Sequence, residues 1–433
     1  MAQSASDIYQ INMEVVRKQL PALYELNSTA ESLLSKNAEK FRISVTPNGN
    51  DFRVPLKVAP PASFGTFSMN GGSLGTGNGF TAAQFYQTYF PMSLAVDVNL
   101  SAMVATSGGS NLSVVNAWKE NMKDAMPSFQ RLSDAGFHNI GGNTGLIGTS
   151  TALSTATYTL ETSFGANLIQ IGMPLEILTG DGATWRTSGV SPDNLPTVSA
   201  LDKINRTITL TNTGGLTLTA GDKFYFRGSI AAGSPPTTTW LNGLYYFHTT
   251  STSGSILGLT KTSYDIMPNL VNVNGALVPA HGWQAKAQVR QRRGLIPKGY
   301  KGLIHDAQAA QLRNLGLSIS EIHIPSGGSF ATTDVGSGVG DVIKFWDIDH
   351  LIDVHQSKVQ VDWLLPGDNW CRVYGQELDF YKSPEGKMIF EGRNSSGTVT
   401  AKFSFFLTSQ VNYVCVDPGR ESVLYGASIP SGF

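Results

Sequence analysis

One short segment concentrates the residue types that bind metal ions and transfer protons. It spans residues 347–355, and its carboxylate and imidazole side chains are those of Asp347, Asp349, His350, Asp353 and His355. If the segment is a strand, its odd-numbered positions share one face, so four of these five side chains line up. The spacing matches no standard zinc site, and alternating polar residues on a half-exposed strand give the same pattern. We therefore expect no metal ion there and leave the role of the segment open.

The other histidines give no support for a hydrolase triad. They are scattered along the chain without an evident nucleophile, at His138, His248, His281, His305 and His323. No pair of carboxylates stands out for glycoside cleavage. The glycines near 75–79 do not form a dinucleotide-binding loop, because no apolar strand precedes them and no helix follows. We therefore expect no catalytic residue, no cofactor and no enzymatic activity.

The charge content is low for a protein that faces water on all sides. Charged residues make up 15% of the 433 residues, against a usual share of about 25%. Because depletion of charge is typical of the centre of an interface, we expect neighbouring subunits to cover much of the surface. A β-rich protein whose faces carry serine and threonine has the same composition, and this alternative stays open.

The formal net charge of −1 argues against a chain whose whole purpose is to bind nucleic acid. A local basic run is present nevertheless, made of Lys286, Arg290, Arg292, Arg293, Lys298 and Lys301. We favour pairing of these cations with acidic groups of neighbouring subunits over direct contact with phosphate. The two cysteines, Cys371 and Cys415, fit neither a disulfide framework nor a metal site, so we expect buried thiols.

The amino-terminal residues show no secretion signal. They lack both a basic region and an apolar core, and no apolar run in the chain is long enough to span a membrane. These features predict synthesis and folding in a cytoplasm.

The longest helical pattern covers residues 111–137, and we expect the other elements to be arranged around it. Asn111 is a suitable N-cap, Gly136 a suitable stop, and Pro127 predicts a bend. Apolar residues recur at steps of three and four and so form one stripe, at Val115, Trp118, Met122, Ala125, Phe129 and Leu132.

The residues before this helix predict appendages rather than a core. Residues 1–40 are expected to form an arm with two short helices. Residues 41–58 have the pattern of a β-hairpin, and an uncharged glycine-rich stretch follows from 59 to 80. Residues 84–103 are expected to form a strand pair or one strand with a bend. Together, residues 41–100 predict a long two-stranded excursion that cannot bury a core alone.

The residues after the helix are mainly strand-like. A glycine-rich joint at 136–148 leads into alternating apolar residues from 155 to 227, typical of a small antiparallel barrel or curled sheet. Residues 229–239 have the composition of a surface linker. A helix is expected within 301–317, carrying Leu303 and Ile304 among its apolar residues and ending at Gly316. Strands dominate from 342 onward, and we expect them to pair with strands that precede the helix.

The order of these parts resembles the major capsid proteins of tailed bacteriophages, which have the Hong Kong 97-type fold. The phrases GMPLEIL, NRTITLTN and AGDKFYFRG are similar to a barrel-like insertion of that family, and NYVCVDP is similar to its closing strand. The resemblance implies an α+β fold with a spine helix, an extended loop, and peripheral and axial domains. Its implied domains are an N-terminal arm (1–40), an extended hairpin loop (41–92), a peripheral domain (93–150) with the spine helix at 111–137, a β-rich insertion (151–235), an axial domain (236–340) and C-terminal peripheral and axial strands (341–433).

The resemblance also implies function and partners. It implies a structural subunit that assembles into hexamers and pentamers of an icosahedral head, packages double-stranded DNA non-specifically and contacts no membrane. The expected location is the virion, after assembly in the host cytoplasm, with a portal and with scaffolding or decoration proteins as further partners. The short arm implies a separate scaffolding protein or none. Some members cross-link through a lysine of the extended loop, but this loop offers only Lys57, at its base, so we expect no cross-link.

Two other functions fit parts of the sequence. A nanocompartment shell has the same fold and encloses enzymes rather than DNA. A β-rich carbohydrate-binding or receptor-binding virion protein would explain the glycine-rich and threonine-rich strands, and it would be a compact monomer or trimer.

Overall fold

The computed structural model describes residues 39–40, 51–59 and 81–99, seven helical positions between 125 and 137 together with His138, and most of 146–312 and 342–429. The chain divides into two compact units. Unit 1 comprises Met1–Lys36, Thr88–Asp134 and Val373–Asn412, and unit 2 comprises Asn37–Gln87, Ala135–Arg372 and Tyr413–Phe433. Strands predominate over helices among the described residues, and no helix among them is long and apolar enough to cross a membrane.

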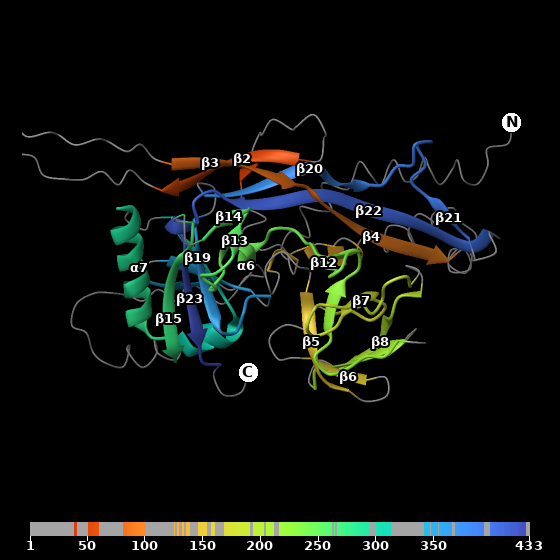
Figure 1. Ribbon diagram of the computed structural model, residues 1–433, viewed down its shortest axis with the longest axis horizontal. Coiled ribbons are helices and arrows are strands. Elements are labelled where there is room, and N and C mark those ends of the chain that lie inside the picture. The colour runs from red at the N-terminus through yellow and green to blue at the C-terminus, as the bar shows by residue number, and fades with distance from the viewer. Residues whose placement is uncertain are drawn as a thin grey trace, which may run out of the picture. The chain divides into compact units, whose positions relative to one another are not determined.

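A five-stranded sheet contains the strands of unit 1. Its order is β1-β20-β22-β21, with β4 paired to β22. The strands are β1 (Glu39–Lys40), β4 (Phe90–Asn99), β20 (Trp370–Phe380), β21 (Phe390–Arg393) and β22 (Val399–Cys415). In Figure 1, β4 lies along β22 although the two are far apart in sequence. This pairing confirms that strands near the carboxyl end pair with a strand that precedes the helix.

Alternation along β4 explains how unit 1 forms its core. Met92, Leu94 and Val96 pack against a buried cluster, while the residues between them are exposed. A strand with period two buries one face and leaves the other to solvent. The cluster itself consists of Ala125, Phe129, Phe380, Met388, Ile389, Phe405 and Leu407.

The first sheet of unit 2 has six antiparallel strands. Their order is β7-β10-β5-β6-β9-β8. Their bounds are β5 (Leu146–Leu153), β6 (Thr157–Leu160), β7 (Leu175–Leu178), β8 (Thr197–Asp202), β9 (Thr207–Thr211) and β10 (Lys223–Phe226). The two ends of this order meet, because Pro174 forms a bridge with Thr197 and the Leu175 amide donates to the Pro196 carbonyl at 2.9 Å. The sheet therefore closes on itself around apolar side chains such as Phe224 and Ile208.

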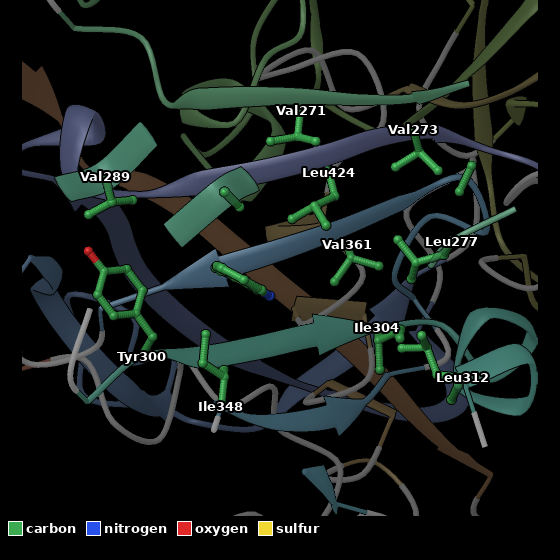
Figure 2. Close-up of a cluster of buried hydrophobic side chains, with 14 of the residues drawn as sticks. Val271, Val273, Leu277, Val289, Tyr300, Ile304, Leu312, Ile348, Val361 and Leu424 are labelled. Carbon is green, nitrogen blue, oxygen red and sulfur yellow. The ribbon is translucent and has the colours of Figure 1, made fainter. Parts of the chain in front are cut away.

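The second sheet of unit 2 mixes parallel and antiparallel pairs. Its order is β15-β23-β19-β16-β18-β17, and the pairs β15-β23 and β16-β18 are parallel. The strands are β15 (Asn269–Gly275), β16 (Lys301–Ile304), β17 (Val342–Phe345), β18 (Ile348–Ile352), β19 (Gln360–Leu364) and β23 (Ser422–Ala427). Helix α7 (Pro279–Arg293) contributes Ala285 and Val289 to the same buried cluster as Val271, Val361 and Leu424. Figure 2 shows these strand residues on neighbouring strands of the sheet.

The remaining elements are short. They are β11 (Ile230–Ala231) paired with β12 (Thr237–Thr238), α6 (Leu244–Phe247), β13 (Ser255–Ile256) paired with β14 (Leu259–Thr260), η3 (Pro418–Arg420), and β2 (Asp51–Ala59) paired with β3 (Thr81–Thr88). The pair β2-β3 forms a two-stranded sheet of its own.

The spine helix is described only in part. All seven described positions between residues 125 and 137 are helical, and Ala125 and Phe129 of the predicted stripe are buried. The earlier part of the pattern and Pro127 lie outside the described residues. Gly136 does not stop the helix as predicted, because the helix continues to Phe137. A Cβ at Gly136 would lie 2.8 Å from the indole Nε1 of Trp240, so this glycine is needed for close packing.

Three further expectations need correction. Lys301–Ile304 is the buried strand β16, and the helix begins only at residue 306, because a short apolar run fits both structures equally well. Residues 229–239 contain the β11-β12 pair, in which Ile230 is buried. The end of the glycine-rich joint belongs to β5.

The two-stranded excursion is shorter than predicted. Strand β3 ends at Thr88, and after Tyr89 the chain continues as β4, which belongs to the sheet of unit 1. The course of the chain from β3 to β4 agrees with the predicted strand that has a bend. Strand β4, however, is not part of the two-stranded excursion. The predicted first hairpin strand, 41–46, and the predicted helices of the arm lie outside the described residues.

Candidate functional site: a buried histidine between two carboxylates

The acidic and histidine-rich segment does not align its side chains as the pattern predicts. Strand β18 ends at Ile352, so Asp353 and His355 lie beyond the region where residues alternate between two faces. Asp347 lies outside the described residues. Asp349 forms an ion pair with Lys301, at 2.6 Å, and both side chains are partly exposed.

His350 is a buried core residue. Its Nδ1 lies 2.9 Å from the Ile348 carbonyl oxygen, and its Nε2 accepts a hydrogen bond from the Trp363 indole at 2.9 Å. Because Nε2 accepts, the proton of the neutral ring is on Nδ1. A Cβ at Gly302, its partner on β16, would lie 2.1 Å from the His350 ring. Both ring nitrogens are thus used in packing the sheet.

Asp353 and His355 come together with a histidine from another part of unit 2. The carboxylate of Asp353 lies 3.3 Å from Nε2 of His138 and accepts from the His355 amide at 2.8 Å. The rings of His138 and His355 lie 6.3 Å apart. Among the described residues, no group of three or more histidine, cysteine, aspartate or glutamate side chains is arranged to hold a metal ion.

A different cluster concentrates buried charge, and the sequence pattern did not reveal it. His248 follows α6, Asp362 lies in the middle of β19, and Glu421 directly precedes β23. Nδ1 of His248 lies 2.7 Å from Asp362, and its Nε2 lies 3.6 Å from Glu421. All three side chains are fully buried. We call these three residues the His248 cluster.

Uncharged amide groups donate further hydrogen bonds to the two carboxylates. Asp362 accepts from the side-chain amides of Gln356 and Gln360, the latter at 2.8 Å. Glu421 accepts from the side-chain amide of Asn369 at 2.5 Å and from the Leu365 backbone amide at 3.1 Å. A buried carboxylate is stable only when its oxygens are paired in this way. The cluster therefore joins α6, β19 and the start of β23 through charge-assisted hydrogen bonds.

Burial and charge act in opposite directions on His248. Burial by itself lowers the pKa of the imidazole, but the hydrogen bonds and charges of Asp362 and Glu421 outweigh it and raise the pKa to about 9. His248 is therefore a cation at neutral pH. Nearby, burial and then the charge of Asp362 raise the pKa of Tyr245 well above its ordinary value.

The arrangement can hold a proton but offers no reaction centre. A general acid or base needs contact with a substrate, and all three side chains are shielded from solvent. Trp370 covers the His248 ring edge-on, with ring centroids 5.8 Å apart. The sequence does contain a signal for the cluster, because Asp362 lies between the apolar residues Val361 and Trp363 of a strand in which every residue is buried.

The chain is similar to phage capsid proteins. Comparison of the sequence with family models and with curated proteins gives no match. Among solved structures, the cyanophage A-1(L) capsid asymmetric unit is similar with a TM-score of 0.49 and 13% identity, over 91% of each chain.

Two other solved structures show the range of similar proteins. That of Mycobacterium phage Bobi has a TM-score of 0.43 and 9% identity, covering 92% of this chain and 91% of its own. The holo-SrpI encapsulin complex from Synechococcus elongatus has a TM-score of 0.39 and 10% identity, covering 91% and 87%.

Proposed function

We propose that this chain is the repeating subunit of a closed protein shell, the major capsid protein of a tailed phage, with a Hong Kong 97-type fold. In this proposal identical subunits form hexamers and pentamers, and these form the icosahedral head around double-stranded DNA. The chain acts as a structural protein and not as an enzyme. Assembly takes place in the host cytoplasm, with a portal and with scaffolding or decoration proteins as additional partners.

The observation that carries this proposal is the two-stranded sheet β2-β3. Among the described residues, no third strand joins it. An isolated two-stranded sheet is marginally stable in water, so it needs another surface to cover it. A neighbouring copy of the chain provides such a surface at every position of a closed shell.

Two further features support self-association. Charged residues are scarce, at 15%, which suits a surface largely covered by copies. The sheet containing the strands of unit 1 is assembled from distant segments, since β4 and β22 pair along their length. A unit closed by such a long-range pairing can hold its shape while the β2-β3 sheet lies against a neighbour.

Purification followed by light scattering and negative-stain microscopy tests the proposal. We expect closed particles of megadalton mass that contain double-stranded DNA when isolated from infected cells. A stable monomer or trimer at micromolar concentration would contradict a shell and would favour a carbohydrate-binding or receptor-binding virion protein. Shells that contain an enzyme and no DNA would contradict the phage function and would favour a nanocompartment.

A further inference from the structure

His305 occupies the N-cap position of a helix in unit 2. It follows strand β16 directly, and the described helical residues after it are 306–312. Its Nδ1 accepts a hydrogen bond from the Ala307 backbone amide at 3.0 Å, and its carbonyl oxygen accepts from the Ala309 amide at 3.0 Å. An N-cap side chain satisfies one of the first backbone N–H groups, which have no partner within the helix. His305 therefore supplies a capping hydrogen bond to this helix.

The cap depends on a neutral imidazole. Because Nδ1 of His305 accepts, the proton of the neutral ring is on Nε2. A second proton would occupy Nδ1, and the ring would then present a donor to the Ala307 amide in place of an acceptor. The resulting cation would also lie at a helix N-terminus, which carries partial positive charge. Protonation of this one ring therefore removes the cap and places an unfavourable charge beside it.

The charges that face His305 come from three segments. Burial has the largest effect and lowers the pKa of His305, whose exposed fraction is 8%. Lys358, in the turn before β19, lowers the pKa further, while Asp306 of the helix and Asp353 after β18 raise it. Asp353 also lies 3.3 Å from Nε2 of His138. The net result is a pKa below the ordinary value of 6.5, so His305 is neutral at pH 7.

The capped helix connects two other segments of unit 2. Gln308 is fully buried, and its side-chain amide donates to the Lys358 carbonyl oxygen at 2.7 Å and to the Ser428 carbonyl oxygen at 2.8 Å. Ser428 follows β23 directly, and Lys358 precedes β19. Gln308 lies in the first turn of the helix, so its two hydrogen bonds depend on that turn being closed.

We propose that His305 is an acid-sensitive cap, whose protonation opens the first turn of this helix and weakens the contacts of Gln308 with Lys358 and Ser428. At neutral pH the ring accepts from the Ala307 amide and the turn is closed. On acidification Nδ1 takes a proton from solvent, the hydrogen bond from Ala307 is lost, and the imidazolium faces the charge of Lys358. The switch lies within one chain, so it does not depend on the formation of the proposed shell.

The direction of the pH dependence follows from the lowered pKa of His305. A histidine whose pKa is lowered by folding contributes stability that is present above its ordinary pKa, here 6.5, and is lost as pH falls through the folded pKa. We therefore expect a closed first turn at pH 7 and its opening below about pH 6.5. His248, whose pKa is raised, acts in the opposite direction and at higher pH.

Hydrogen exchange of the full-length protein, measured by mass spectrometry and corrected for the intrinsic rate at each pH, tests this proposal. Lowering the pH from about 7.5 to about 5 should reduce the protection of residues 306–312 about fivefold, the equivalent of the roughly 1 kcal/mol that an N-cap contributes. The sheet of strands β5 to β10 is the internal reference, because no histidine occurs between residues 146 and 227. Its protection should stay within about twofold.

Three variants make the test specific. His305→Asn is the decisive one, because an asparagine side chain accepts from the same amide at both pH values, so the helix should stay protected in acid. His281→Gln changes another histidine whose Nδ1 accepts from a backbone amide, and it should leave the acid opening of 306–312 unchanged. Lys358→Gln keeps the carbonyl oxygen that binds Gln308 but removes the charge. It should shift the opening to higher pH, and it keeps the test decisive if His305→Asn does not fold.

Two results would overturn the proposal. Full protection of 306–312 in the wild type at about pH 5 would show that the cap does not open. An equal loss in the wild type and in His305→Asn would assign the opening to other groups. An equal loss in the reference sheet would also contradict a local switch, because the whole chain would then be unfolding. Each readout is a protection within the chain, so failure of the protein to form shells would leave the test decisive.

Discussion

At the scale of single residues, variants of the His248 cluster measure how much buried charge contributes to the stability of this protein. We predict that His248→Gln destabilises the fold by about 3 kcal/mol, because it leaves Asp362 and Glu421 without a cation in a site closed to water. The midpoint of urea unfolding, followed by tryptophan fluorescence, measures this loss, and Trp370 lies against His248 as a local reporter.

A second histidine gives the matched control for this change. His281 lies at the start of α7, where its Nδ1 accepts one hydrogen bond from the Val278 amide at 3.2 Å. His281→Gln should cost no more than about 1 kcal/mol, the usual value of one such bond. Equal losses for the two variants would show that the His248 cluster contributes nothing beyond an ordinary hydrogen bond.

The same cluster predicts how stability changes with pH. The folded pKa of His248, about 9, lies above its ordinary value of 6.5. A raised histidine pKa stabilises the fold fully below pH 6.5, and this contribution is lost as pH rises through about 9. The difference between the folded and the ordinary pKa corresponds to about 3 kcal/mol of folding stability. We therefore expect the urea midpoint to fall between pH 6.5 and 9 in the wild type, and His248→Gln to remove most of that decline. An identical decline in both proteins would assign it to other groups.

At the scale of elements, the contact between α7 and the turn after β17 is set by a glycine. A Cβ at Gly282 would lie 2.2 Å from the Trp346 indole, and that indole donates to the Pro279 carbonyl at 2.7 Å. Replacing glycine by alanine at a helical position normally stabilises a helix by about 1 kcal/mol. Here we predict that Gly282→Ala destabilises by about 1–3 kcal/mol, because the overlap outweighs that gain.

The unfolding midpoint again measures this effect, and the exposed face of α7 supplies the control. Gln284→Ala also introduces alanine into α7, two positions away, where the side chain faces solvent. It should change stability by less than about 0.5 kcal/mol. A stabilised Gly282→Ala variant would mean that Trp346 moves aside and that the helix is not held by this contact.

The elements that the sequence predicts correctly are those with a clear period. Alternation predicts β2, β7 and β9, and the apolar stripe predicts the burial of Ala125 and Phe129. Strand β16 is mistaken for helix because Leu303 and Ile304 are buried on both sides and show no period. Helix α7 is missed because its buried positions are small residues, although Pro279 at its start and Gly294 after its end are the usual signals of helix termini.

The candidate site could not be predicted in the same way. His248, Asp362 and Glu421 come from three separate segments, and each has an ordinary local sequence. Only the pairing of β19 with β23, and the turn that follows α6, brings them together. The spacing of the acidic residues in 347–355 predicts that they share one face of a strand. Strand β18 ends before Asp353, so the segment is not one continuous strand.

At the scale of the whole molecule, the β2-β3 sheet leads to the last prediction. Residues 60–80 connect the two strands. We predict that replacing these 21 residues with a four-residue turn leaves a folded, soluble protein, because the buried clusters among the described residues of both units are formed by other segments. The same change should abolish closed particles, since it removes the segment that we expect to lie over a neighbouring copy. Light scattering and negative-stain microscopy measure the outcome.

A variant of the original length distinguishes the contribution of the side chains of residues 60–80 from that of the length of this segment. Replacing residues 60–80 with a glycine- and serine-rich segment of equal length keeps the span between β2 and β3 but removes the apolar side chains. If those side chains hold the neighbour, this variant also fails to close shells, because a flexible segment must be ordered at a cost of about 1–2 kcal/mol per residue without gaining contacts. Normal shells from both variants would show that the connection does not hold subunits together and that the contacts between copies lie on the two units themselves.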